Sequence, residues 1–334
     1  MRRCLLPSLT RTCGTAHNPK ASRFTALALL SAMGLLVTLA IAKTPPASSS
    51  QKKEKKVPAL RWDPPRVDAP IPSISATPPC MLPDVLKQAG QRAEELVDHL
   101  QNFIAHEQVR YEQRNSPVMR GMPIATGIQQ IGSEQTEMFI TAKFDYIVDF
   151  GKKSEPLQVH ETRTPLAGTD DGHLSTILDK GLPVLALVFY PAMQGDYEMR
   201  CEGSTQWNNQ PAWVVHFGQI KGKRPRTVTM ETPTKVYALA IKGRAWIAAD
   251  SGQVMHLETN LVRGIPLIEL EESAFRVDYA PVRFQSQNVE IWLPQFATAY
   301  TDFAKRRMIS EHTFSDFQLF SVQTQETIQK PKEP

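Results

Sequence analysis

The chain has 334 residues, with 38 Lys or Arg and 34 Asp or Glu, which gives a formal net charge of +4. The excess of positive charge lies in residues 1–79, because residues 80–334 contain 26 basic and 31 acidic residues. Phosphate binding requires a cationic surface. The acidic remainder therefore excludes nucleic acid as the expected partner.

Residues 1–42 have the composition of an export signal. Five basic residues precede an apolar run over 24–42, and Ala40 and Ala42 are small residues at the positions that a signal peptidase reads. We expect cleavage after Ala42 and export to the periplasm or cell envelope. The run is also close to the length that spans a bilayer. The alternative is therefore an uncleaved N-terminal anchor that contacts the membrane through residues 24–42.

Residues 43–79 are rich in proline and lysine. They contain nine prolines, a serine run and the cluster KKEKK over 52–56. Such a composition buries too little apolar surface to fold by itself. We predict a disordered linker over 43–79, a folded domain over 80–324 and a polar tail over 325–334.

Four cysteines are present, and two of them, Cys4 and Cys13, fall in the predicted signal. Cys80 and Cys201 remain for an oxidising compartment, where they would form one disulfide. Spacing alone does not establish that the two residues lie close together. Two separate buried thiols are the alternative.

The folded domain begins with a helical pattern and continues with strand patterns. Apolar residues at helical spacing predict one long amphipathic helix over 82–106, and an apolar stretch over 173–193 predicts a short covering helix with a buried turn or strand. Period-two alternation predicts strands over 137–150, 157–164, 197–207, 212–220, 236–249, 254–262, 267–270, 275–285, 289–293, 296–303 and 316–324.

Short connections between so many strands indicate antiparallel order. The predicted class is α+β and mainly β: a curved antiparallel sheet that forms an unclosed β-barrel. Two strand patterns place large apolar side chains on one face, where they would either bind a ligand or fill a core. These candidate ligand-binding residues are Phe144, Tyr146, Val148, Trp213 and Phe217.

Two segments carry a resemblance to a known family. GRAWIAADSGQVMHLE over 243–258 reads as a strand, an Asp-x-Gly turn and a returning strand, and FSDFQLF over 314–320 reads as a last strand. With the long N-terminal helix and the export signal, the chain resembles the periplasmic lipoprotein-carrier (LolA/LolB-like) family. The resemblance implies an unclosed barrel, capped by helices, that holds acyl chains in an apolar cavity.

No catalytic or metal-binding pattern stands out. His106-Glu107 and His160-Glu161 begin like the HExxH zinc motif, but each lacks the second histidine. Pairing Cys201 with His216 as a nucleophile would need a proximity that the sequence does not show. We therefore expect a non-enzyme without metal or cofactor that binds or carries a hydrophobic or lipidated ligand. A cell-envelope interaction module with a filled core and a protein partner is the alternative, and a secreted hydrolase is the third and least supported hypothesis.

Overall fold

The computed structural model describes residues 58–71, 73–99, 102–115, 136–151, 158–170, 172, 174, 181–182, 184–232, 235–285 and 288–319. The predicted signal over 1–42, the first part of the predicted linker and the predicted tail lie outside the described residues. No helix within the described ranges is both long and apolar enough to cross a membrane.

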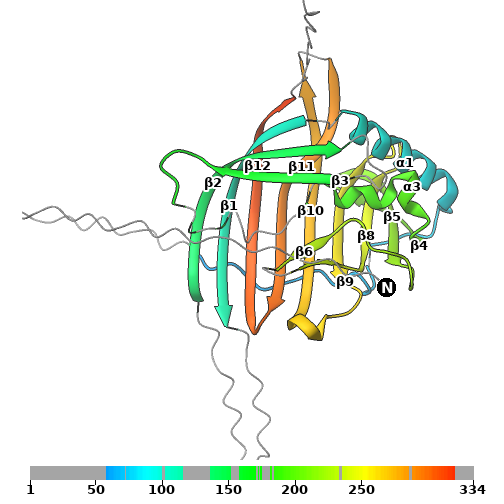
Figure 1. Ribbon diagram of the computed structural model, residues 1–334. Helices are drawn as coiled ribbons and strands as arrows, with labels where there is room; N and C mark the ends of the chain where they lie inside the picture. The colour runs from blue at the N-terminus through cyan, green and yellow to red at the C-terminus, as the bar shows by residue number, and fades with distance from the viewer. Residues whose placement is uncertain are drawn as a thin grey trace, which may run out of the picture. The chain divides into compact units, whose positions relative to one another are not determined.

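Strands dominate the described part of the chain (Figure 1). The helical elements are α1 (Leu82–His99), η1 (Leu185–Phe189), α3 (Pro191–Gln194) and η2 (Pro266–Ile268). The strands are β1 (Asn102–Asn115), β2 (Thr136–Gly151), β3 (Gln158–Pro165), β4 (Tyr197–Trp207), β5 (Gln210–Gln219), β6 (Thr229–Glu231), β7 (Val236–Ala238), β8 (Ile241–Ala248), β9 (Val254–Leu261), β10 (Leu270–Phe284), β11 (Val289–Phe303) and β12 (Arg306–Leu319).

Ten of these strands form one antiparallel sheet in the order β3-β2-β1-β12-β11-β10-β9-β8-β5-β4. Strands β3 and β4 are its two edges, so the sheet does not close into a barrel. Figure 1 shows that the sheet curves and that α1 and α3 lie on its concave side. The prediction of a curved, unclosed antiparallel sheet is confirmed.

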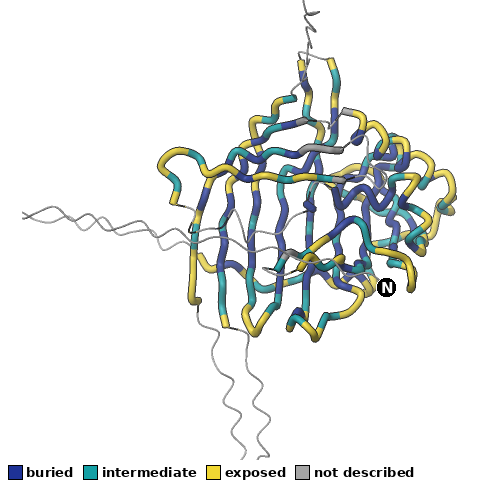
Figure 2. Tube along the Cα trace, viewed as in Figure 1, coloured by how far each residue is buried: buried dark blue, intermediate teal, exposed yellow. Residues whose placement is uncertain are grey.

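The core lies on the concave face. Alternate residues of every long strand point inward, as the pleat requires, and the register aligns these residues from strand to strand. The main cluster of buried side chains combines this face with α1 and with η1, whose five residues are all buried. Figure 2 shows the result as buried segments along the strands and exposed turns at their ends.

Several predicted boundaries are wrong. The helix predicted over 82–106 ends at His99, and the residues from 102 onward belong to β1. Strand β1 lies between β2 and β12, so its backbone hydrogen bonds go to both neighbours. This pairing prevails over the helical spacing of Phe103 and Ile104, which also fits a strand. His106, the last residue of the predicted helix, therefore lies on a strand.

Three further differences involve the second half of the chain. The strand predicted over 236–249 divides into β7, which pairs with β6, and β8, which belongs to the large sheet. Of the residues predicted as a strand over 267–270, Leu267 and Ile268 belong to η2 and Leu270 begins β10. The two strands predicted on either side of Pro294 are the single strand β11. A register shift at Asp278/Tyr279, opposite Pro294, accommodates a residue that has no N–H to donate.

Residues 58–71 and 73–80 form a segment that we call the outer belt, although most of them fall within the predicted disordered linker. The belt crosses the outer face of the sheet from β1 to β4 (Figure 1). Near its start the Leu60 backbone N–H donates to Glu112 Oε2 at 2.6 Å. Farther along, Arg244 Nη2 donates to the Ala69 carbonyl at 3.0 Å. Leu60 and Val67 are buried, and because the sheet supplies these contacts, composition alone did not reveal them.

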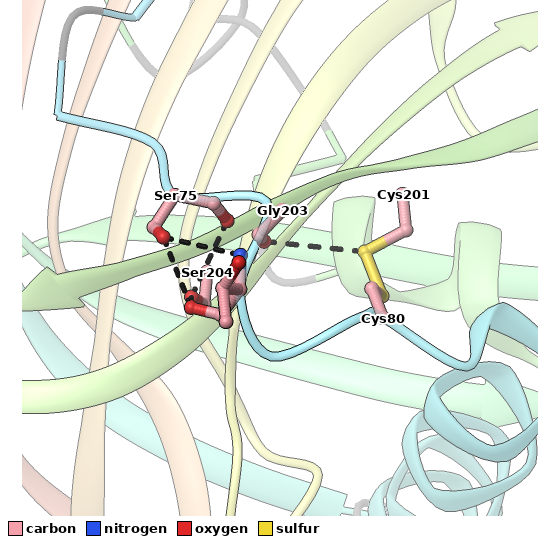
Figure 3. The surroundings of a disulfide bond; sticks show 6 residues. Ser75, Cys80, Cys201, Gly203 and Ser204 are labelled. Atoms are coloured by element: carbon pink, nitrogen blue, oxygen red, sulfur yellow. Dashed lines mark hydrogen bonds between the residues drawn. A yellow bond between two sulfur atoms is a disulfide. The ribbon is translucent and has the colours of Figure 1, made fainter.

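The belt ends at a disulfide. Cys80 and Cys201 are bonded, with their Cα atoms 6.3 Å apart and 121 positions between them in the sequence. Just before it, Ser75 pairs with Ser204 of β4 through two backbone hydrogen bonds of 2.8 Å. Figure 3 shows both contacts side by side. Of the two alternatives for these cysteines, the disulfide is confirmed, and it fixes the start of α1 to an edge strand.

Candidate ligand-binding face

The sheet brings the five predicted ligand-binding residues onto its concave side but not into one group. Phe144, Tyr146 and Val148 lie on β2, whereas Trp213 and Phe217 lie on β5. Six strands separate β2 from β5 in the sheet. Any ligand that touched both groups would have to cross most of the concave face.

Four of the five side chains are completely buried, and Trp213 is partly exposed. The ring of Phe217 contacts the rings of Phe189 and Tyr197, with centroids 6.1 and 5.8 Å away. The ring of Tyr146 lies 5.4 Å from that of Phe314 on β12. These residues pack against other side chains in the described structure, so the face is filled rather than hollow there.

Helix α1 covers another part of the same face. Its small residues Ala89 and Ala93 are buried toward the sheet, and a cavity of ≈ 30 Å³ lies between the helix and the ends of β9, β10 and β11. The lining includes Val254, Tyr279 and Ile291. A cavity of this size holds about one water molecule, whereas ligand pockets have volumes of about 300–1,000 Å³. An acyl chain therefore fits only if α1 moves.

Hydrogen bonds join α1 to the β8–β9 turn and to α3. Arg92 Nε donates to the Ser251 carbonyl in the β8–β9 turn at 2.9 Å. Gln194 Nε2 of α3 donates to the Leu86 carbonyl at 3.0 Å and to the Phe189 carbonyl at 2.7 Å. Gly252 has φ +72°, and a Cβ there would lie 2.6 Å from Gln88 Cβ. The Asp-x-Gly turn is thus the surface on which α1 rests.

A buried cluster of charged groups lies on the concave face near β2. Glu107 on β1 accepts hydrogen bonds from Arg163 Nε at 2.6 Å and Nη2 at 3.1 Å. His312 Nδ1 lies 2.7 Å from Glu107 Oε1, and its Nε2 lies 2.8 Å from Ser310 Oγ. The guanidinium of Arg163 also lies 4.8 Å from the centre of the Tyr146 ring. Each buried charge therefore has a partner, as burial requires.

The cluster shifts the titration of its acids. Burial raises the pKa of Glu107, but Arg163 and the hydrogen bond to His312 outweigh it and lower this pKa from 4.5 to about 2. Burial also raises the pKa of Glu161, and there Arg163 does not offset the effect. The concave face thus contains one firmly ionised carboxylate and one carboxyl that holds its proton more readily.

This cluster was not predicted from the sequence. Glu107 and His312 lie in segments for which no strand is predicted, and the strand predicted over 157–164 does not by itself place Arg163 beside them. The usable signal was alternation: Phe103, Ala105, Val109 and Tyr111 share the face of Glu107, and all of them are buried.

The larger hollows lie on the outer side, next to the belt. One of ≈ 620 Å³ is lined by belt residues 65–69 and the ends of β8 to β11, and one of ≈ 500 Å³ lies beside β4 and β5. Both are open surface grooves. Within the described residues, no group of three or more His, Cys, Asp or Glu side chains could hold a metal ion.

The cysteine–histidine pair considered as a nucleophile is not formed. Cys201 is in the disulfide, and His216 Nε2 instead lies 3.2 Å from Asp68 of the belt.

No family model and no curated protein matches the chain. Its fold is similar to that of a DUF1329 family protein from Desulfovibrio piger (9% identity, 72% of this chain and 94% of that chain, TM-score 0.39). It is also similar to a putative outer membrane lipoprotein-sorting protein domain from Vibrio parahaemolyticus (10% identity, 72% of this chain and 94% of that chain, TM-score 0.32). A third match is Mycobacterium tuberculosis lipoprotein LppX (10% identity, 70% of this chain and 95% of that chain, TM-score 0.22). The LolA-like resemblance expected from the sequence is thus found among solved structures as a distant one.

Proposed function

We propose that the domain is an extracytoplasmic binding or carrier protein for a lipid-like or lipidated ligand, held on the concave face beneath α1. One observation carries the proposal: the apolar concave face of an open sheet is covered by a separate helix rather than by a second sheet. A cover of this kind can move without breaking the hydrogen bonds between strands.

The contacts of α1 are made by side chains and by a turn, not by strand pairing. The helix packs on the core through Val85, Ala89, Ala93, Leu96 and Val97. It rests on a glycine turn, and the disulfide fixes the segment just before its first residue. Displacement of α1 about that end would uncover Val254, Tyr279 and Ile291, which already border the small cavity. The apolar face continues from there to Phe217, and we keep this residue and the other four sequence candidates as proposed ligand contacts.

The test is saturable binding of a fluorescent fatty acid to delipidated full-length protein, with native mass spectrometry of any copurifying lipid. Two isoleucines provide a matched pair of variants. Ile291 and Ile309 are both buried, but Ile291 lines the space under α1 and Ile309 packs with Leu60 on the outer face. Either change to alanine costs about 2–5 kcal/mol of stability.

We expect Ile291→Ala to change the affinity for the fatty acid and Ile309→Ala to leave it unchanged. The carrier proposal would be contradicted if the folded protein showed no saturable binding to any acyl probe. Equal effects of the two variants would place the ligand elsewhere than beneath α1.

The packed interior favours a second candidate. Because Phe144, Tyr146, Val148 and Phe217 are fully buried, the same fold would serve as a non-catalytic envelope scaffold that binds a protein partner. This candidate predicts a specific crosslinked partner and no copurifying lipid.

A further inference from the structure

We infer that one rim of the sheet docks on an anionic lipid surface. This inference concerns the ends of the strands and their connections, and it is separate from the proposed ligand site, which lies on the concave face beneath α1. The docking rim, which we call the basic rim, consists of segments 219–226, 262–272 and 302–307.

The topology places these segments at the same end of the sheet. Strands β5, β9 and β11 run in the same direction, because one antiparallel strand separates each from the next. Their ends therefore lie along one rim (Figure 1). A hydrogen bond of 3.0 Å from the Ala304 N–H to the Glu269 carbonyl joins two of the three segments directly.

Charge is concentrated at this rim. The three segments contain eight Lys or Arg and four Asp or Glu, whereas residues 80–334 as a whole contain more acidic than basic residues. Asp196, which lies beside segment 219–226, pairs with Lys223 and Arg226, and the other basic residues still outnumber the acidic ones. Lys221, Arg224, Arg263, Lys305 and Arg306 are exposed. A local positive potential on an otherwise acidic domain is the pattern expected for contact with anionic lipid headgroups.

Exposed apolar side chains lie among these charges. Leu267, at the tip of the β9–β10 connection, is 82% exposed, and Val262 and Ile220 are 43% and 38% exposed. Val262 precedes Arg263, and Ile220 precedes Lys221. Met138 and Phe139, also exposed, lie near the start of β2 at the same end of the sheet.

This spacing favours a lipid surface over a protein partner. A protein interface needs a contiguous apolar centre depleted of charge, but here the exposed apolar side chains are spread over three parts of the rim, and Val262 and Ile220 each precede a basic residue. In a bilayer interface, such side chains insert among the acyl chains while the adjacent cations contact phosphates. The surface is therefore assigned to lipid.

The test measures hydrogen exchange in the full-length protein on two kinds of vesicle, one of phosphatidylcholine alone and one with equal parts of phosphatidylglycerol. Comparing the two kinds removes any contribution of residues 24–42 that does not depend on lipid charge. We expect slower exchange in segments 262–272 and 302–307 on the anionic vesicles than on the neutral ones.

Variants then distinguish binding through the basic rim from a general effect of the protein's charge. The changes Lys221→Gln with Arg224→Gln, and separately Leu267→Ser, should reduce or abolish the difference between the vesicles. The matched changes Lys87→Gln with Arg283→Gln remove two exposed cations near the opposite end and should leave it intact. Equal exchange of the rim on both vesicles, or equal effects of the two double variants, would overturn the inference and leave protein contact as the role of this rim.

Discussion

Substitution of Gly252 by alanine tests whether α1 is a cover that rests on the β8–β9 turn. The residue has φ +72°, and an added Cβ would lie 2.6 Å from Gln88 Cβ and 3.0 Å from the Gln88 carbonyl carbon. Because real Cβ atoms do not approach so closely, the helix must shift away from the turn. The expected result is local loosening of α1 with the sheet intact.

The magnitude has two parts. A non-glycine residue in the left-handed region costs roughly 1–2 kcal/mol, and overpacking against the helix adds about 1–3 kcal/mol. Gly168 separates the two, since its φ is +80° and an added Cβ there would meet nothing within 4 Å. Gly168→Ala should therefore show only the backbone cost.

Chemical denaturation measures the total loss, and hydrogen exchange shows where it occurs. We expect Gly252→Ala to lose more stability than Gly168→Ala and to speed exchange in 82–99 but not in β10 or β11. Association of the fatty-acid probe should also become faster. Equal stability losses with unchanged exchange in α1 would refute the idea that this turn supports the helix.

Four other outcomes follow from particular contacts. Glu107→Leu leaves Arg163 buried without its carboxylate partner and should cost about 3–5 kcal/mol, while adding Arg163→Met should recover much of that loss in urea denaturation. The folded-state pKa of Glu107 is lowered from 4.5 to about 2. Its ionised form therefore contributes about 3 kcal/mol to stability above pH 4.5, and this contribution is lost as pH falls toward 2. A Glu107→Gln protein whose stability falls with acid in the same way as that of the wild type would contradict this. Reduction of the disulfide, or Cys80→Ser with Cys201→Ser, should cost up to about 4–5 kcal/mol of stability for a loop of this length. It should also speed hydrogen exchange in the outer belt and in the first turn of α1. Unchanged exchange in these segments would show that the belt stays in place without the bond. Burial lowers the pKa of His256, but hydrogen bonds to Asp278 and Glu258 outweigh this effect and raise the pKa above 6.5. The contribution of His256 to stability is therefore complete below pH 6.5 and declines as pH rises through the raised pKa. Asp278→Asn should flatten the fall in stability over that range.

Local pattern was sufficient for much of the fold. Alternation over 137–150 predicted β2 to within one residue at each end, and Gly252 marked a true turn between β8 and β9. Both features depend on neighbouring residues only, because side-chain period and turn geometry follow from local backbone angles. The candidate ligand residues were likewise placed on the correct, concave face.

Contacts between distant residues could not be predicted in the same way. The end of α1 at His99 depends on β1 pairing with β12, and Phe103 lies opposite Leu319. The outer belt is held against the sheet by side chains such as Glu112 and Arg244, which lie far from it in the sequence. Neither partner is visible in the composition of the segment itself.

The sequence by itself determined the mainly β class, the pleat that gives the sheet one apolar face, and the two cysteines available for a bond. The tertiary structure alone decided that Cys80 and Cys201 meet, that Glu107 and Arg163 are paired inside the domain, and that the space under α1 measures ≈ 30 Å³. The physical reason is that periodicity fixes which way a side chain points, whereas burial and cavity volume depend on what packs against it from elsewhere in the chain.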